Sequence, residues 1–252
     1  MKSSSDKSPN PKSPNHPITQ SSNPPMTTNY QLISMGRVYF VSGIDTGIGK
    51  TVVVGTMCRA LQEAGHDWIS VKMVQTGCDG FSEDLDAHRA LAGVGRFPED
   101  EEGLTAPQIF KFPASPLLAA GLEGRTVDLK RIAASVETCA KRRETVLVEG
   151  AGGLLVPLTE ETLTADFVAE QGWPLILVAS GRLGAINHIL LSLEAAKARG
   201  IPLAGIVMND YPKADPLLFD DACKAVARAL KRMGIACPVV SQPDALHTIW
   251  AS

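Results

Sequence analysis

The chain carries a glycine-rich loop of the kind that binds phosphate. Residues 41–51 read VSGIDTGIGKT, which nearly matches the pattern G-x-x-x-x-G-K-[ST], but Ile44 stands where the first glycine belongs and Gly43 comes one place early. A strand pattern runs into this loop and a helical pattern follows it, so we expect its backbone N–H groups to face a phosphate. Lys50 would lie along the β and γ phosphates, and the Thr51 hydroxyl would take a magnesium position. The alternative is an ordinary turn from strand to helix, but the packing of such a turn does not require the sequence Gly-Lys-Thr.

Two more residues suit this chemistry because each ends a buried strand. Lys72 ends the strand within SVKMVQTG, and Glu149 ends the strand within TVLVEGAGG. In a parallel sheet, ligands bind at the carboxyl ends of strands, where a lysine can face a cleft and a carboxylate can hold magnesium. The glycines Gly150, Gly152 and Gly153 let the backbone approach a ligand closely. Read alone, Lys72 could instead reach the surface, and Glu149 could be incidental to a tight turn.

The acidic segment SEDLDAHRAL offers a further carboxylate. Ser82 is a suitable helix N-cap, and Glu83 and Asp84 would then lie in the first turn, where they complement the helix dipole. This reading does not account for Asp86. We therefore expect Asp86 to be the second magnesium carboxylate.

The elements that position these residues alternate along the chain. Continuous apolar runs are typical of strands covered on both faces, as in a parallel sheet, and helical spacing separates most of them. The predicted fold class is α/β: a single-domain, P-loop NTPase-like, doubly wound and mostly parallel sheet with helices on both faces. The strands are predicted at 37–43, 67–74, 145–150, 173–180, 202–209 and 237–241, and the clearest helices at 50–65 and 184–200.

The first residues differ in composition from the rest. Residues 1–34 are rich in Ser, Pro and Asn and nearly free of large apolar side chains, so we expect a disordered tail followed by one domain over 35–252. Met26 or Met35 could be the physiological start. A transit peptide is the weaker alternative, because no Arg precedes Arg37.

Composition restricts the classes of protein. A chain of 252 residues that is 44% apolar can bury a large core, and a net charge of −3 without a basic run argues against nucleic acid as a partner. No apolar run is long enough to span a membrane. The five cysteines are far apart and form no C-x-x-C pair, which indicates reduced thiols and neither a disulfide framework nor a zinc site. We expect a soluble, cytoplasmic protein.

Taken in order, the motifs resemble those of the dethiobiotin synthetase family. The resemblance extends from about Arg37 to at least Asp210, and its early glycine is the variant typical of that family. The segments that carry it are GIDTGIGKT, KMVQTG, PASP at 113–116, VEGAGG at 148–153, LGAINH at 183–188 and MND at 208–210.

The resemblance implies a ligase that converts 7,8-diaminononanoate, CO2 and ATP to dethiobiotin, ADP and phosphate. The route would pass through an N-carbamate and a carbamic-phosphoric anhydride, with ATP as co-substrate and Mg2+ as cofactor. It also implies a homodimer, in which the loop matching Leu183 to Asn187 holds the substrate's tail carboxylate at the subunit interface. A helix that begins at this loop fits that role, since the N–H groups at a helix start favour an anion.

Site residues follow by matching position. Catalysis is expected from Lys50, Lys72 and Thr46. Nucleotide contacts are expected from Gly47, Ile48, Gly49, Lys50, Thr51, Val52, Asp86, Glu149 and Asn209. Substrate contacts are expected from Lys72, Thr76, Gly150, Gly153, Leu183, Gly184, Ala185, Ile186 and Asn187. Magnesium is expected at Thr51, Asp86 and Glu149. The histidines are interpreted as structural or surface residues, with His188 close enough to the carboxylate loop to orient it.

Three alternatives stay open. A partition- or septum-type ATPase switch would carry a lysine early in its loop, where this chain has Asp45, and no basic C-terminal helix is present to meet a membrane. A cobyrinate-type amidating synthetase would need a glutaminase domain, for which no residues remain. An inactive relative that only binds nucleotide is the third, although Lys50, Lys72, Asp86 and Glu149 are all retained.

The sequence departs from the family pattern at three places. Met73 replaces the proline that usually follows the lysine, Gly47 stands where relatives often have Glu, and the C-terminal segment from Cys237 lacks the usual Gly-Glu-x-P wording. These changes bear on substrate contacts in the loop and on the choice of nucleotide.

Overall fold

The computed structural model describes residues 35–246, and the predicted tail at 1–34, the alternative starts before Met35 and His247 lie outside that range. Its elements are β1 (Arg37–Gly43), α1 (Lys50–Glu63), β2 (Trp68–Lys72), β3 (Gln75–Thr76), α2 (Glu83–Ala92), α3 (Pro98–Glu101), β4 (Ile109–Phe110), α4 (Pro116–Leu122), α5 (Leu129–Arg142), β5 (Thr145–Gly153), α6 (Thr164–Gln171), β6 (Leu175–Ser180), α7 (Ala185–Ala198), β7 (Leu203–Asn209), α8 (Pro216–Met233), β8 (Val239–Val240) and the 3-10 turn η1 (Pro243–Leu246).

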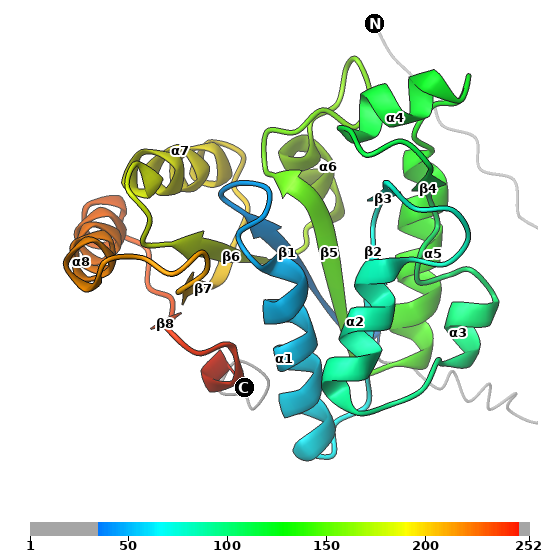
Figure 1. Ribbon diagram of the computed structural model, residues 1–252, viewed down its shortest axis with the longest axis horizontal. Helices are drawn as coiled ribbons and strands as arrows, with labels where there is room; N and C mark the ends of the chain where they lie inside the picture. The colour runs from blue at the N-terminus through cyan, green and yellow to red at the C-terminus, as the bar shows by residue number, and fades with distance from the viewer. Residues whose placement is uncertain (1–34, 247–252) are drawn as a thin grey trace, which may run out of the picture. The chain divides into compact units, whose positions relative to one another are not determined.

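A six-stranded sheet forms the centre of the described chain (Figure 1). Its strand order is β2-β5-β1-β6-β7-β8, and every neighbouring pair is parallel. β6 is completely buried and apolar except for its last residue, as expected for a strand with helices on both faces. The predicted α/β fold with a parallel sheet is confirmed.

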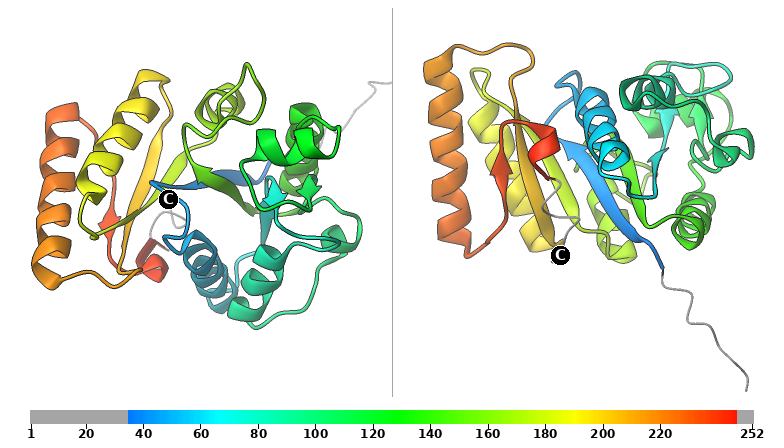
Figure 2. Two further views of the ribbon diagram at one scale, coloured as in Figure 1. Left: turned by 45° about the horizontal axis from the view of Figure 1, so that its top comes forward. Right: turned by 90° about the horizontal axis from the view of Figure 1, so that it is seen from below.

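Helices cover both faces of this sheet, as the three views together show (Figures 1 and 2). α1 lies on one face with α2 packed beside it, while α5, α6 and α7 lie on the other. Since crossovers between parallel strands are right-handed, connections that run in opposite directions along the sheet put their helices on opposite faces. Here α1 leads from β1 toward β2, whereas α6 leads from β5 past β1 to β6. A crevice forms at such a reversal, beside the carboxyl end of the central strand.

The register of the sheet brings two predicted site residues together. Lys72, the last residue of β2, lies directly opposite Glu149 on β5, and Glu149 in turn pairs with Val41 of β1. Below them, the sheet is packed with apolar side chains such as Phe40 and Val148, both fully buried. The rigid core therefore fixes the position of both charged groups.

Most predicted elements are confirmed, with shifted ends. The strand predicted at 67–74 is shorter, at Trp68–Lys72, because the chain turns after Lys72 to form the two-stranded sheet β3-β4. The strand predicted at 145–150 continues to Gly153. All five cysteines are unpaired in the structure. None of the helices within residues 35–246 is long and apolar enough to cross a membrane.

Candidate active site

The phosphate-type loop joins β1 to α1, and glycine is required where the helix starts. Gly49 is the N-cap of α1 and has φ +85°, a left-handed conformation. A Cβ there would lie 2.5 Å from the side-chain nitrogen, Nδ2, of Asn209. Because Gly49 has no side chain to cap the helix, the N–H groups of the first turn are left for another acceptor. The start of α1 is thus suited to an anion.

Lys50 is held inside this loop. Only 7% of its surface is exposed, and its Nζ donates a hydrogen bond of 2.9 Å to the carbonyl of Asp45. Burial, followed by the nearby ammonium of Lys72, lowers the pKa of Lys50 to about 8, although three carboxylates oppose the shift. Lys50 therefore loses its proton at a lower pH than an ordinary lysine.

Lys72 lies against two carboxylates at the end of β2. Its Nζ is 2.6 Å from Asp84 Oδ2 and 2.7 Å from Glu149 Oε1. Burial alone would lower the pKa of Lys72, but Glu149 and then Asp84 outweigh it and raise the pKa above its ordinary value. Burial would likewise raise the pKa of Glu149, yet Lys72 and a hydrogen bond from His88 hold it well below its usual range. Both groups keep their charges.

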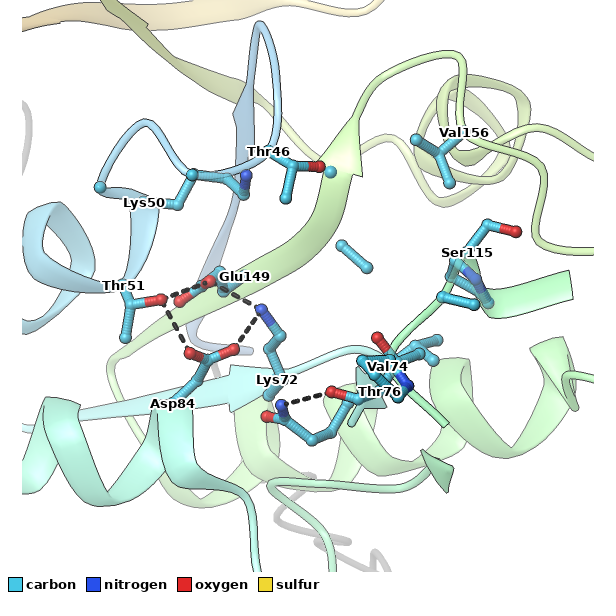
Figure 3. A pocket seen from close by; sticks show the side chains of 18 of the residues that line it. Thr46, Lys50, Thr51, Lys72, Val74, Thr76, Asp84, Ser115, Glu149 and Val156 are labelled. Carbon is cyan, nitrogen blue, oxygen red and sulfur yellow. Dashed lines mark hydrogen bonds and ion pairs between the residues drawn. The ribbon is translucent and has the colours of Figure 1, made fainter. Parts of the chain in front are cut away.

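The hydroxyl of Thr51 completes this group (Figure 3). Thr51 Oγ1 donates toward Asp84 Oδ1 at 2.9 Å and lies 3.1 Å from Glu149 Oε1. One hydroxyl and two carboxylates therefore converge on one point beside the phosphate-type loop. Mg2+ usually takes one or two carboxylates and completes its shell with phosphate oxygens and water, so this oxygen set fits it. Within residues 35–246, no cluster of three or more His, Cys, Asp or Glu side chains could form an all-protein metal cage.

These residues open onto a cavity of about 680 Å3. Its wall combines the loop, the ends of β2 and β5, and the PASP segment, which Figure 3 shows through Ser115 on the side opposite Lys50 and Thr51. The lining residues are Thr46, Gly47, Gly49, Lys50, Thr51, Lys72, Val74, Gln75, Thr76, Asp84, Pro113, Ala114, Ser115, Pro116, Glu149, Ala151, Gly152, Val156 and Tyr211. A cavity of this size holds a small-molecule ligand.

Comparison with known proteins decides the family. The model of the AAA domain family matches residues 37–244. The ATP-dependent dethiobiotin synthetase of Chlorobaculum tepidum is 49% identical over 209 residues, which cover 82% of this chain and 87% of that relative. One from Haemophilus influenzae is 47% identical over 184 residues, covering 73% of this chain and 96% of the relative. The chain belongs to the dethiobiotin synthetase family. The resemblance inferred from the motifs is confirmed, and these relatives support the interpretation as a ligase and not as a switch ATPase or an amidating synthetase.

A solved ParA family ATPase from Chlorobium tepidum shares 14% identity, with a TM-score of 0.47 over 85% of this chain and 89% of that one.

One carboxylate of this family member was predicted wrongly. Asp86 points away from the cavity: its side chain is 52% exposed and pairs with Arg96 at 3.2 Å. Asp84 takes the place expected for it. Residues two apart on an α-helix differ by about 200° in direction, so only one of the two can face Thr51. Ser82 caps α2 as predicted, accepting from the backbone N–H of Leu85, and Asp84 lies in the first turn as well as in the site.

Two glycines predicted to touch substrate do not line the cavity. A Cβ on Gly150 would lie 2.6 Å from the ring of Phe40, so Gly150 faces the core. Gly153 lies beside a separate groove. Ala151 and Gly152 form the wall in their place, because the chain between Gly150 and Gly153 continues as part of β5 instead of turning at once.

Other predicted residues fall into two groups. Lys50, Thr51, Lys72, Glu149, Thr46, Gly47, Gly49 and Thr76 line the cavity. Ile48 is buried, Val52 is 55% exposed on α1, and neither is part of the wall. Asn209 donates to the carbonyl of Ile48 at 2.7 Å, and its predicted contact with adenine stays a prediction. Tyr211, which no motif indicated, lines the cavity and is 58% exposed.

The segment Leu183 to Asn187 does not line this cavity. α7 starts at Ala185 after the left-handed N-cap Gly184, as the helical pattern predicted, and Leu183 is 80% exposed. The segment's role in binding a carboxylate remains a prediction. Its neighbourhood contains an ion pair that motif reading missed, between Arg182 and Asp45 of the phosphate-type loop, with His188 3.8 Å from the same carboxylate.

Met73, where relatives have proline, has a specific partner. Its backbone N–H donates to the carbonyl of Glu149 at 3.0 Å, and its side chain is fully buried. Proline lacks this donor, so the departure adds a bond between β5 and the turn after β2.

Proposed function

We propose that the protein catalyses the ATP-dependent closure of 7,8-diaminononanoate and CO2 into the cyclic urea dethiobiotin, with release of ADP and phosphate. The observation that carries the proposal is the convergence of two lysines, Lys50 and Lys72, on one cavity. Beside them lie the hydroxyl of Thr51 and the carboxylates of Asp84 and Glu149. Two cations facing one space suit a reaction in which negative charge develops on both a carbamate and a phosphoryl group.

The first stage joins CO2 to ATP. One amine of the substrate, uncharged when it reacts, forms an N–C bond to CO2 and loses a proton, which leaves a carbamate. A carbamate oxygen then attacks the γ phosphorus, and the bond from that phosphorus to the bridging oxygen of ADP breaks. Lys50 lies in the loop, where phosphate is expected, and Lys72 lines the same cavity from the end of β2, so both ammonium groups would stabilise negative charge on the reacting oxygens.

The second stage closes the ring. The neighbouring amine attacks the carbonyl carbon of the mixed anhydride, the C–O bond to phosphate breaks as the urea forms, and the proton lost by the amine goes to the departing phosphate. Such intramolecular reactions can reach effective molarities of about 10^5 to 10^8 M, so no protein nucleophile is required. Cys58 and Cys139 are not placed to serve as one: both are fully buried in the core and absent from the cavity wall, and burial raises the pKa of each thiol to about 12.

Magnesium belongs in this proposal as the partner of ATP. Thr51, Asp84 and Glu149 would hold it, since one oxygen of each carboxylate lies within 3.1 Å of Thr51 Oγ1. When bound, the ion would neutralise charge on the phosphate oxygens. Asp84 thus replaces Asp86 in the set expected from the sequence.

A homodimer in the cytoplasm completes the proposal. The exposed side chains of Leu155 and Leu191 line one groove beside Asp45 and Thr46, and Leu183 is exposed at the start of α7. A second copy of the chain would cover these apolar groups and bring the predicted carboxylate loop to the shared site. Leu191→Glu should then convert a dimer to a monomer in light scattering after gel filtration, and a dimer unchanged by this substitution would place the interface elsewhere.

The unpaired cysteines suit a reducing compartment such as the cytoplasm.

The test is phosphate release by the purified chain with Mg-ATP and bicarbonate, with and without 7,8-diaminononanoate, while dethiobiotin is followed by mass spectrometry. Release that depends on the diamine and matches product one for one supports the proposal. Release without diamine, and without a new mass, contradicts it. Lys50→Ala should abolish turnover, whereas Lys224→Ala, at an exposed lysine of α8, should not.

A further inference from the structure

A chain of buried polar groups runs from the cavity into the core behind β2. Glu149 Oε2 lies 2.8 Å from His88 Nε2, and His88 Nδ1 lies 3.0 Å from Ser70 Oγ. Ser70 Oγ also accepts a bond of 2.7 Å from Arg89, whose guanidinium binds both oxygens of Asp100, at 3.0 and 2.7 Å. None of these five side chains is more than 5% exposed. Burying so many polar groups is costly unless each is satisfied, so their arrangement is tightly determined.

Two residues of this region lie on the same face of α2. Asp84 and His88 are four positions apart, so their side chains lie one above the other on the helix. Asp84 reaches Thr51 and Lys72, and His88 reaches the far oxygen of Glu149. One helix therefore supplies a carboxylate of the site and also the group that holds the other carboxylate.

The carboxylate of Glu149 fixes the donor role of one ring nitrogen of His88. A charged carboxylate can only accept, so the nitrogen that faces it, Nε2, carries a hydrogen and donates it. The other ring nitrogen, Nδ1, is held by Ser70, which Arg89 fixes in turn.

The hydrogen bond from His88 gives the two carboxylate oxygens of Glu149 different partners. His88 binds Oε2, while Oε1 faces Lys72 Nζ at 2.7 Å and Thr51 Oγ1 at 3.1 Å. The carboxylate cannot rotate about its terminal bond without breaking the bond to His88. Oε1 is therefore kept on the side of the cavity.

We propose that His88 is a positioning residue for the metal site: it fixes the carboxylate of Glu149, and Ser70 and Arg89 hold its ring in place. The inference rests on the proposed function insofar as Thr51, Asp84 and Glu149 hold a divalent cation. Loss of such a supporting partner typically weakens metal affinity about 10- to 100-fold.

Two amide variants separate positioning from a purely structural role. In His88→Gln the side-chain nitrogen can reach the place of Nε2 and still donate to Glu149, whereas in His88→Asn it reaches only the place of Nδ1, beside Ser70. Binding of Mn2+ to the full chain with ADP is measured by electron paramagnetic resonance. Asp84→Asn, which should abolish tight binding, verifies that the ion occupies this site. We expect His88→Asn to weaken Mn2+ binding about 10- to 100-fold and His88→Gln to stay within about threefold of the parent.

A merely structural histidine predicts another pattern. If His88 only satisfied Ser70, His88→Asn would bind Mn2+ as well as the parent, and that result overturns the proposal. Ser70→Ala provides a second test should His88→Asn not fold: it removes the partner of His88 Nδ1 without touching Glu149, and unchanged Mn2+ affinity there would also overturn the proposal. Mn2+ binding that follows this pattern in a chain that forms no dethiobiotin would uphold His88 and refute only the proposed reaction.

Discussion

The choice between two aspartates of α2 gives the sharpest prediction. Asp84→Asn should greatly reduce turnover, while Asp86→Asn, two residues away on the same helix, should leave it almost unchanged. Both substitutions remove one negative charge and keep the size of the side chain. Asp84 contacts Lys72 and Thr51, and Asp86 contacts only the exposed Arg96 among the residues described.

The expected magnitude follows from these contacts. At 2.6 Å, the attraction between Asp84 and Lys72 is about 6 kcal/mol with an effective dielectric constant of about 20. Desolvation offsets part of this, and breaking such a pair on one side costs about 3 to 5 kcal/mol. A loss of about 3 to 4 kcal/mol in the transition state corresponds to a fall in kcat/KM of about 10^2 to 10^3. A surface pair such as Asp86 with Arg96 is worth at most about 1 kcal/mol, and none of that acts on the reaction.

The assay is diamine-dependent phosphate release over a range of Mg2+ concentrations, with thermal unfolding as a check that both variants fold. Asp84→Asn should also need more Mg2+ for half-maximal rate. If Asp86→Asn lost activity while Asp84→Asn kept it, the placement of α2 against the cavity would be refuted.

The remaining predictions concern pH, substrate binding and stability. Because the pKa of Lys50 is lowered to about 8, its charge is present below that pH and lost above it, so kcat/KM for ATP should fall about tenfold per pH unit beyond pH 8. By the same shift, unfolding should release this lysine to its ordinary pKa of 10.5, so Lys50 makes the free energy of unfolding rise with pH between about 8 and 10.5. Asn187→Ala should raise KM for 7,8-diaminononanoate about tenfold or more, as expected for a lost hydrogen bond to a carboxylate, and KM for ATP much less. Met73→Pro should lower the free energy of unfolding in urea by about 1 to 3 kcal/mol, because the carbonyl of Glu149 loses its donor at 3.0 Å.

Each of these has a control. Lys50→Arg keeps its charge at high pH and should remove the alkaline fall, and a fall of the same midpoint in that variant would assign it to another group. Equal effects of Asn187→Ala on both KM values would count against a carboxylate site in its loop. Met73→Leu keeps the backbone donor and should be nearly neutral, so equal losses in the leucine and proline variants would point to packing instead of the hydrogen bond.

Local spacing in the sequence was enough to find the nucleotide loop and the two strand ends. Lys50 and Thr51 follow a strand and begin a helix, and about fifteen consecutive residues contain the strand, the loop and the start of the helix. Lys72 and Glu149 each end a buried run. Since parallel strands bring their carboxyl ends to one edge, their meeting could be expected before any coordinates.

Packing between distant segments selects the side chains that complete the site. Asp84 and Asp86 are both aspartates in the first turn of α2, and the rotation of α2 against α1 and β2 selects between them. His88 looks like an ordinary helical residue until packing brings it to Glu149, 61 positions away. Gly150 and Gly152 differ in role because Phe40, from another strand, fills the space beside the first. The loop, the fold class and the family could all be predicted from the amino-acid sequence, because they depend on local pattern and on the order of the strands. The direction in which each side chain points depends on contacts between distant segments, and these contacts form only when the core packs.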